Sequence, residues 1–274
     1  MLGKLIKNDL KRSGRKIVNI YIAAFIAVAA MGISLFTNIG IAKIISTAAL
    51  LVISGIAIIV TVVSMFTDFR DSVFGDAGYL TNTLPVRSRS MLFSKWLTSV
   101  IWILLSFIFL AFSSFLIIVF NEGGSSGDTL AMISEILPML GFPSKEVLLV
   151  WIPLEGLRVL AFIAVNTAIV YFSVTVANIK PFQSLGVFGV IICFFVFFFA
   201  INYAGVYLDA SIPFGVLVDS AAKVSVSFDM TELDSAFYAG GLSVKLSSCL
   251  FDILAFVVVH VVNATLIEKK VNLK

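Results

Sequence analysis

The stretch WLTSVIWILLSFIFLAFSSFLIIVF, from Trp96 to Phe120, carries no charged side chain. A helix of about 20 apolar residues is long enough to cross the hydrocarbon core of a bilayer. Five similar runs occur elsewhere in the chain. We therefore predict six membrane-spanning helices, at about 17–36, 44–66, 96–120, 159–176, 182–203 and 246–267. The fourth has an alternative start at Val147, because apolar sequence begins there and is interrupted by Glu155 and Arg158.

The composition also indicates a membrane protein. Of the 274 residues, 60% are hydrophobic and only 13% are charged. Such a chain has too little polar surface to enclose a soluble core. We expect an all-α membrane protein whose single transmembrane domain covers residues 1–274.

Positive charge predicts the orientation, because Lys and Arg gather in short cytoplasmic loops. With the N-terminus inside, most of the 19 basic residues fall on the cytoplasmic side. The exceptions are Lys43, Lys145, Arg158, Lys223 and Lys245. We therefore expect both termini in the cytoplasm.

Residues 1–16 predict an amphipathic helix that lies on the membrane surface. Leu2, Leu5, Ile6 and Leu10 recur at helical spacing, and most basic side chains face away from them. Such a helix suits an anionic inner leaflet. It is either a positively charged anchor alone or also a contact for a partner.

Two segments lie on the outer side, at about 121–146 and 204–245. The second is acidic, with Asp209, Asp219, Asp229, Glu232 and Asp234. Neither is long enough for a catalytic domain of ordinary size. We expect short caps over the spans.

The sequence lacks the motifs that would mark an enzyme. The phosphate-binding pattern G-x-x-x-x-G-K-[ST], the zinc pattern H-E-x-x-H and the nucleophile pattern G-x-S-x-G are absent. His260 is the only histidine, and no cysteine pair has metal spacing. We predict no catalytic residue, no metal site and no ATP site in this chain.

Four ionisable residues in or beside the predicted spans are candidate site residues, because charges in a bilayer mark structural pairs or transport pathways. Glu155 and Arg158 stand three residues apart, where helix side chains meet. They form either an ion pair near the outer boundary or a substrate contact. Asp252 lies about two turns into the sixth span, and His260 follows on a neighbouring face. Their role is either structural or that of a proton relay.

The stretch FGDAGYLTNTLPVRSRSMLFSKW, from Phe74 to Trp96, joins the second and third spans on the inner side. Asp76 can cap a short helix there, and Pro85 prevents its easy continuation. One face of this helix would carry Tyr79, Leu80, Thr83 and Leu84. From the residues alone, the helix either transmits force from a cytosolic partner to the spans or simply lies among the lipid headgroups.

The pattern D-x-G-Y-L-T-x-T-L-P-V, followed by a basic and serine-rich turn and by M-L-x-S-K-W, resembles the loop after the second span of ABC-2-type transporter permeases, especially the six-span permeases of Firmicutes. The matching residues are Asp76, Gly78, Tyr79, Leu80, Thr81, Thr83, Leu84, Pro85, Val86, Ser94 and Lys95. The basic start MLGKLIKNDLKRSGRK also looks like the lead-in of that family, and the six-span plan covers the whole chain. Many relatives have an acidic residue directly before Gly-Tyr-Leu, where this chain has Ala77 beside Asp76.

The resemblance implies a membrane subunit of an ABC exporter in a bacterial cell membrane. It would pair with a second permease, identical or homologous, and with two separate ATPase subunits that bind ATP and magnesium. A coupling helix over 76–85 would pass the closure of the ATPases to the spans. Its contact residues would be Asp76, Gly78, Tyr79, Leu80, Thr83, Leu84 and Pro85. Its substrate would be a peptide, lipid or drug, and its other partners would be membrane lipids and not nucleic acid.

Two other functions remain as alternatives. One is a stand-alone secondary transporter that uses Asp252 and His260 for protons. The other is a non-transporting assembly or sensory subunit.

Overall fold

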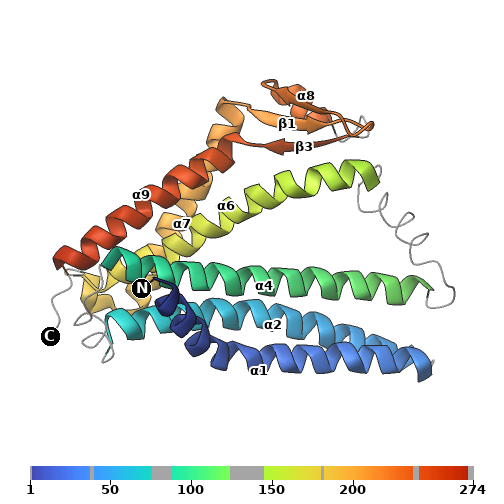
Figure 1. Ribbon diagram of the computed structural model, residues 1–274, viewed down its shortest axis with the longest axis horizontal. Helices are drawn as coiled ribbons and strands as arrows, with labels where there is room; N and C mark the ends of the chain where they lie inside the picture. The colour runs from blue at the N-terminus through green and yellow to red at the C-terminus, as the bar shows by residue number, and fades with distance from the viewer. Residues whose placement is uncertain are drawn as a thin grey trace. The chain divides into compact units, whose positions relative to one another are not determined.

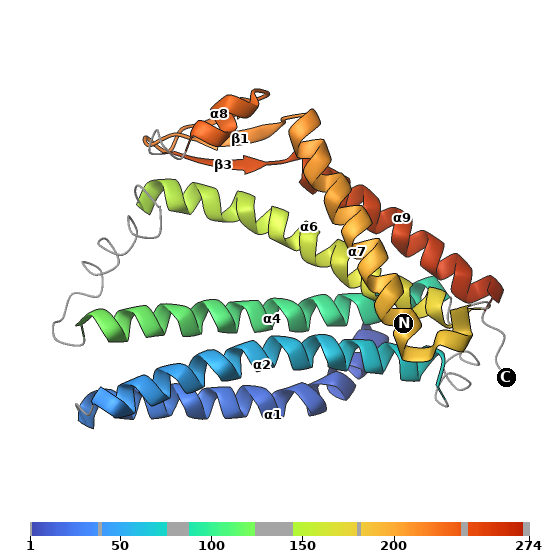
Figure 2. The same ribbon diagram turned by 180° about the vertical axis from the view of Figure 1, so that it is seen from behind.

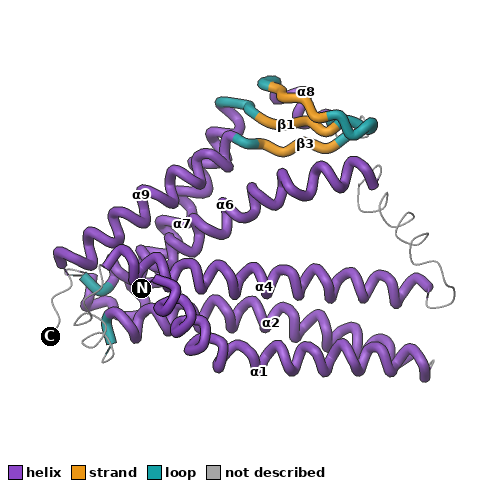
Figure 3. Tube along the Cα trace, in the orientation of Figure 1, coloured by secondary structure: helices purple, strands orange, loops and turns teal. Residues whose placement is uncertain are grey.

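The computed structural model describes residues 2–37, 40–75, 88–123, 145–179, 182–236 and 241–270. Six of its helices are long and apolar enough to cross a membrane, and helix dominates the structure (Figure 3). The chain is a multi-pass membrane protein of the all-α class, as the sequence predicts. Residues 1–126 with 264–274 form one compact unit, and residues 127–263 form a second.

The described part of the first unit contains three long helices, α1 (Leu2–Thr37), α2 (Gly40–Val73) and α4 (Ser88–Gly123). Each packs against the other two, and they run side by side in Figures 1 and 2. Ala27 of α1 and Leu50 of α2 are buried together, and Phe109 of α4 packs against them. Small residues such as Ala27 allow the close backbone approach that stabilises helix pairs in a bilayer.

The amphipathic lead-in and the first span form one continuous helix, α1. Its first turns, dark blue in Figure 1, are inclined to the rest of the helix. Ser13 and Gly14 favour a bend: the Ser13 hydroxyl donates to the Asp9 carbonyl at 2.7 Å, and such bonds to the preceding turn often bend helices. Gly14 also lies against α4, since a Cβ at this position would stand 3.3 Å from the Trp102 ring.

The second unit holds the remaining candidate spans. The fourth is α6 (Lys145–Ala177), a single helix that contains Pro153. It therefore begins close to the alternative start at Val147 and not at residue 159. A short 3-10 helix, η1 (Phe182–Leu185), precedes α7 (Gly186–Ser211). Gly186, the first residue of α7, has a φ of 55°, a conformation that favours glycine.

The sixth span is α9 (Ser247–Lys270). Val165 and Ile169 of α6 are buried with Ala255 of α9, and Phe194 and Phe197 of α7 pack against them. This apolar cluster holds the three helices of the second unit together. The aromatic residues of α7 that face it are therefore part of a protein core.

A small antiparallel sheet lies between α7 and α9 in the sequence, and the sequence analysis did not predict it. Its strands are β1 (Gly215–Val218), β2 (Val224–Ser227) and β3 (Leu242–Lys245), in the order β2-β1-β3 (Figure 3, orange). A short helix, α8 (Met230–Ser235), packs against β1 and β3. The predicted outer cap over 204–245 thus consists of the last turns of α7 followed by a sheet and a helix.

One face of the sheet packs on α6. Val218 pairs with Val224 on one side and with Leu242 on the other, so the three side chains point to the same face. Val218 and Leu242 are buried against Val147 of α6. Val224 remains 56% exposed, so the apolar side of edge strand β2 is left uncovered by α6.

Candidate functional site

The segment predicted to contact an ATPase lies outside the described residues. This holds for Asp76, Gly78, Tyr79, Leu80, Thr83, Leu84 and Pro85. Its flanks are described, because α2 ends at Val73 and α4 begins at Ser88. The segment therefore joins two helices that pack against each other in the first unit.

Close to this segment, α4 is bonded to the lead-in part of α1 through Asp9. The Ser94 hydroxyl donates to Asp9 Oδ2 at 2.7 Å, and Lys95 Nζ lies 3.4 Å from Oδ1. Ser94 is fully buried, and the Lys95 side chain is only 11% exposed. A partly buried, hydrogen-bonded charge of this kind stabilises a fold more than an ion pair at the surface does. We call Asp9, Ser94 and Lys95 the Asp9 clamp.

The Asp9 clamp was missed by the sequence analysis. Ser94 and Asp9 are separated by 85 positions, and local spacing gives no signal over that distance. Ser94 and Lys95 belong to the S-K-W part of the resembling loop, and Asp9 belongs to the resembling basic start. The structure therefore brings the described end of the resembling loop to the resembling basic start.

A second set of contacts joins α1 to α2 and α4 further along the bundle. The Tyr21 hydroxyl lies 2.7 Å from Ser106 Oγ, and Thr61 Oγ1 lies 3.0 Å from the same atom. The Tyr21 ring also stacks on Trp102, with 6.2 Å between the ring centroids. These groups connect all three helices, because Tyr21 is in α1, Thr61 in α2 and Ser106 in α4.

In the second unit, Glu155 and Arg158 form the predicted ion pair on one face of α6. Arg158 Nε donates to both carboxylate oxygens, at 2.9 and 3.0 Å, and Nη2 also contacts Oε1. The Glu155 side chain is 17% exposed. The pairing prediction is confirmed, and the planar guanidinium fork explains why one Arg can hold both oxygens.

Asp209 of α7 is a functional candidate that the sequence analysis placed only in an acidic outer segment. Its Oδ1 accepts hydrogen bonds from the Ser247 hydroxyl at 2.6 Å and from the Ser248 backbone N–H at 2.8 Å. A carboxylate in this position satisfies a free N–H of the first helical turn and opposes the positive end of the helix dipole. Asp209 thus caps α9 from a neighbouring helix.

Asp252 is the most buried of the ionisable candidates, at 7% exposure. Within the described part of the chain its carboxylate has no hydrogen bond or ion pair. It is close enough to Asp209 and Arg158 to interact with both electrostatically. Glu155 contacts the Arg158 guanidinium directly, and Asp252 lies within electrostatic range of that guanidinium and of Asp209.

His260 does not join this group. Its ring packs on Phe256, with 5.5 Å between centroids. Eight residues of helix separate it from Asp252, which corresponds to roughly 12 Å along the axis. The two side chains cannot pass a proton directly. Among the described residues, no group of three or more His, Cys, Asp or Glu side chains is arranged to hold a metal ion.

The two units therefore offer different chemistry. The first has bonded contacts beside the segment 76–87, which suit the transmission of movement. The second has a buried carboxylate beside a fixed ion pair, which suits a structural or charge-sensing role within the helices.

Comparisons with protein-family models, with curated proteins and with solved structures found no match.

Proposed function

We propose that this chain is the membrane subunit of an ABC exporter and that separate ATPase subunits drive it. The observation that carries this function is the resemblance of residues 76–96 to the loop after the second span of ABC-2-type permeases. The Asp9 clamp supports it, because Ser94, Lys95 and Asp9 join the two stretches that resemble that family. The partner chains would supply ATP and magnesium, and a second permease, identical or homologous, would complete the membrane part.

In this function, a displacement of residues 76–87 acts on three helices. It acts directly on the last turn of α2 and the first turn of α4, which flank it. The Asp9 clamp passes the same displacement to α1, since Asp9 is bonded to Ser94 and Lys95 near the start of α4. The contacts of Ser106 with Tyr21 and Thr61 then keep the three helices together further along. The substrate class remains a peptide, a lipid or a drug.

The test is co-purification in mild detergent from the native host, with the bound ATPase identified by mass spectrometry. The native chain should retain an ATPase subunit, and a Tyr79→Ala/Leu84→Ala variant should lose it while still inserted in the membrane. Asn82→Ala is the matched control, because it truncates a residue in the same segment outside the predicted contact face. If the native chain retains no ATPase, the permease function is wrong.

A second variant tests the clamp. Asp9→Asn should leave the ATPase bound, because Asp9 is outside the predicted contact. It should reduce the change in amide hydrogen exchange of α1 that ATP causes in the native complex. An ATP response of α1 equal to that of the native complex would show that the clamp transmits nothing.

A proton-coupled secondary transporter is the second candidate. The observation that favours it is the burial of Asp252 without a hydrogen-bond partner in the described part of the chain. The roughly 12 Å of helix between Asp252 and His260 weighs against a relay that uses both. Asp252→Asn separates the candidates: near-normal transport supports the permease, whereas loss of transport with intact ATPase binding and ATP hydrolysis supports a proton route.

A further inference from the structure

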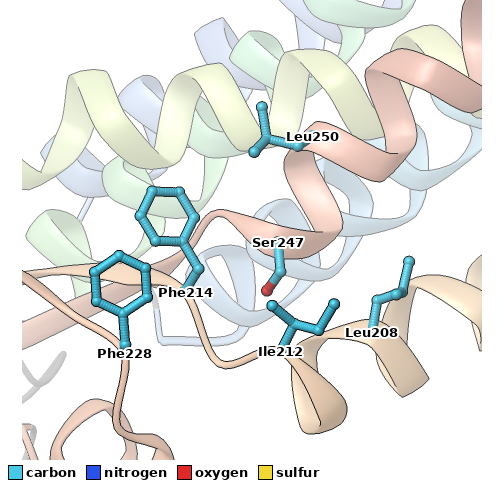
Figure 4. A pocket seen from close by; sticks show the side chains of 6 residues that line it. All are labelled: Leu208, Ile212, Phe214, Phe228, Ser247 and Leu250. Atoms are coloured by element: carbon cyan, nitrogen blue, oxygen red, sulfur yellow. The ribbon is translucent and has the colours of Figure 1, made fainter.

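An apolar groove of about 390 Å³ lies where α7 ends, α9 begins and the sheet is attached. Figure 4 shows the rings of Phe214 and Phe228 on one side, and Leu208 of α7 and its C-cap residue Ile212 on the other. The two rings stack with 5.2 Å between their centroids. Leu250 and Ser247 of α9 complete the lining. The Ser247 hydroxyl already donates to Asp209, so the groove has little hydrogen-bonding capacity to offer a ligand.

The groove continues into an exposed apolar strip on the edge strand. Val224 and Val226 of β2 and Phe228, directly after the strand, are 56%, 57% and 71% exposed. Alternation along the strand places the two valines on one face. The serines between them face the other way, and the Ser227 hydroxyl donates to Glu232 at 2.6 Å. Edge strands that face water usually carry charges. Strand β2 instead carries valines that α6 leaves uncovered, on the same sheet face as the buried Val218, and we call Val224, Val226 and Phe228 the β2 strip.

Two exposed tyrosines of α7 lie directly before the groove. Tyr203 and Tyr207 are 74% and 65% exposed, and tyrosine is enriched where a span meets the headgroups. The helix from Gly186 to Tyr207 is roughly 32 Å long, close to the hydrocarbon thickness of about 30 Å. Leu208 follows directly, so the groove begins where the acyl chains meet the headgroups.

We propose that this groove holds an acyl chain of a membrane phospholipid and that the β2 strip lies in the same leaflet. Lipid is the medium that surrounds α7 and α9, and the groove and strip continue the apolar surface of these helices. An acyl chain needs no hydrogen bonds, which matches a lining of five apolar residues and one serine that is already bonded. The site is independent of ATPase coupling, so it stands or falls separately from the proposed function.

The experiment uses the full chain in phosphatidylcholine vesicles, with Cys193→Ala and Cys249→Ala, and a fluorescent probe on Phe228→Cys. Lipids with brominated acyl chains quench probes inside the bilayer, and iodide quenches probes in water. Val206→Cys on α7 is the positive control, because Val206 is 65% exposed on a span. Ser225→Cys is the matched control, because Ser225 lies in β2 on the face opposite to Val224 and Val226. Leu250→Cys provides a second groove probe if the Phe228 variant does not fold.

The brominated lipid should quench the groove probe as strongly as the Val206 probe and should quench the Ser225 probe much less. Iodide should show the reverse order. Equal iodide quenching at Phe228 and Ser225 would mean that water fills the groove. Protection of the groove probe from both quenchers would mean that protein covers it. Either of these two results would overturn the lipid assignment.

Discussion

Replacement of Asp209 by alanine should loosen the start of α9. The carboxylate accepts hydrogen bonds of 2.6 and 2.8 Å from Ser247 and Ser248, and no other described side chain bonds those two donors. The loss of an N-cap side chain costs about 1 kcal/mol. Removal of a negative charge from the positive end of a helix adds about 0.3–1 kcal/mol.

The site is half-buried, so water can replace part of the hydrogen bonding that the carboxylate provides. The cost should therefore stay below the sum expected for two buried hydrogen bonds to a charged group. We expect about 1.5 kcal/mol for Asp209→Ala, which is roughly a tenfold change in the opening equilibrium. Asp209→Asn keeps an acceptor oxygen but loses the charge, and should cost about half as much.

Cys249 provides the assay, because it lies in the first turn of α9 and is only 2% exposed. In a Cys193→Ala background it is the sole thiol, so a thiol-reactive dye reports when this turn opens. When reclosing is faster than labelling, the labelling rate follows the open population. Labelling should be about tenfold faster in Asp209→Ala.

The control is Glu146→Gln, which removes an exposed carboxylate from the first turn of α6 and leaves the α9 cap intact. Its labelling rate should equal that of the Cys193→Ala parent. If Asp209→Ala also labels at the parental rate, the bonds from Asp209 do not hold the start of α9, and the reasoning about the cap is wrong.

Three further predictions concern the sheet, the first unit and α8. Gly215→Ala should destabilise the protein by about 1–3 kcal/mol, because the new Cβ would stand 2.7 Å from a side chain of α8 and 2.8 Å from a carbonyl of β3. This loss should lower the thermal midpoint of the purified protein. Gly156→Ala, whose Cβ would have nothing within 4 Å, should not lower it. A double-mutant cycle of Tyr21→Phe and Ser106→Ala in bicelles should give a coupling of about 0.6 kcal/mol, and a value near zero would show that the two hydroxyls do not interact. The pKa of Asp229 is lowered because its carboxylate accepts hydrogen bonds from the side chain and backbone of the first turn of α8. Its stabilisation of α8 should therefore be complete above the ordinary carboxyl pKa of about 3.9 and be lost as the pH falls through the lower folded value. Amide exchange of α8, corrected for intrinsic rates, should show this loss, and Asp229→Ser should remove the pH dependence.

The membrane helices could be predicted from the sequence because length and lack of charge are sufficient signals. The Glu155 and Arg158 pair could be predicted because both residues lie on one helix at a fixed spacing. The same reasoning left the start of α6 open between residues 147 and 159, because Glu155 and Arg158 interrupt its apolar run. Their mutual pairing lets both stay within the helix, so the interruption does not mark its start.

The sheet could not be predicted because its strands have only four residues each. In β2 the alternation of valine and serine is present and puts the valines on the same sheet face as Val216 and Val218, but α6 does not cover them, so they stay exposed. A reading that assigns apolar residues to a protein core would choose the right face of this strand but would wrongly bury its valines. The exposure of these apolar side chains is explained only when the strand lies beside the end of a membrane helix.

The bonded contacts of Asp9 and Asp209 could not be predicted because their partners are distant in the sequence. Asp209 and Ser248 are 39 positions apart, and Asp9 and Lys95 are 86 positions apart. Each aspartate alone is an ordinary charged residue near the end of a span. Only helix packing brings the donors to it.

The two ends of the segment 215–245 are fastened to each other. The backbone N–H groups of Leu246 and Ser247 both donate to the Phe214 carbonyl, at 2.8 and 3.3 Å, and Asp209 holds the start of α9 beside them. A segment whose ends are held together should tolerate an insertion, because the entropic cost of closing a loop grows only slowly with its length. The hairpin turn between Asp219 and Lys223 could therefore accept an epitope or a small folded domain, and the three helices of the second unit would stay in register. This turn is a practical site for a reporter.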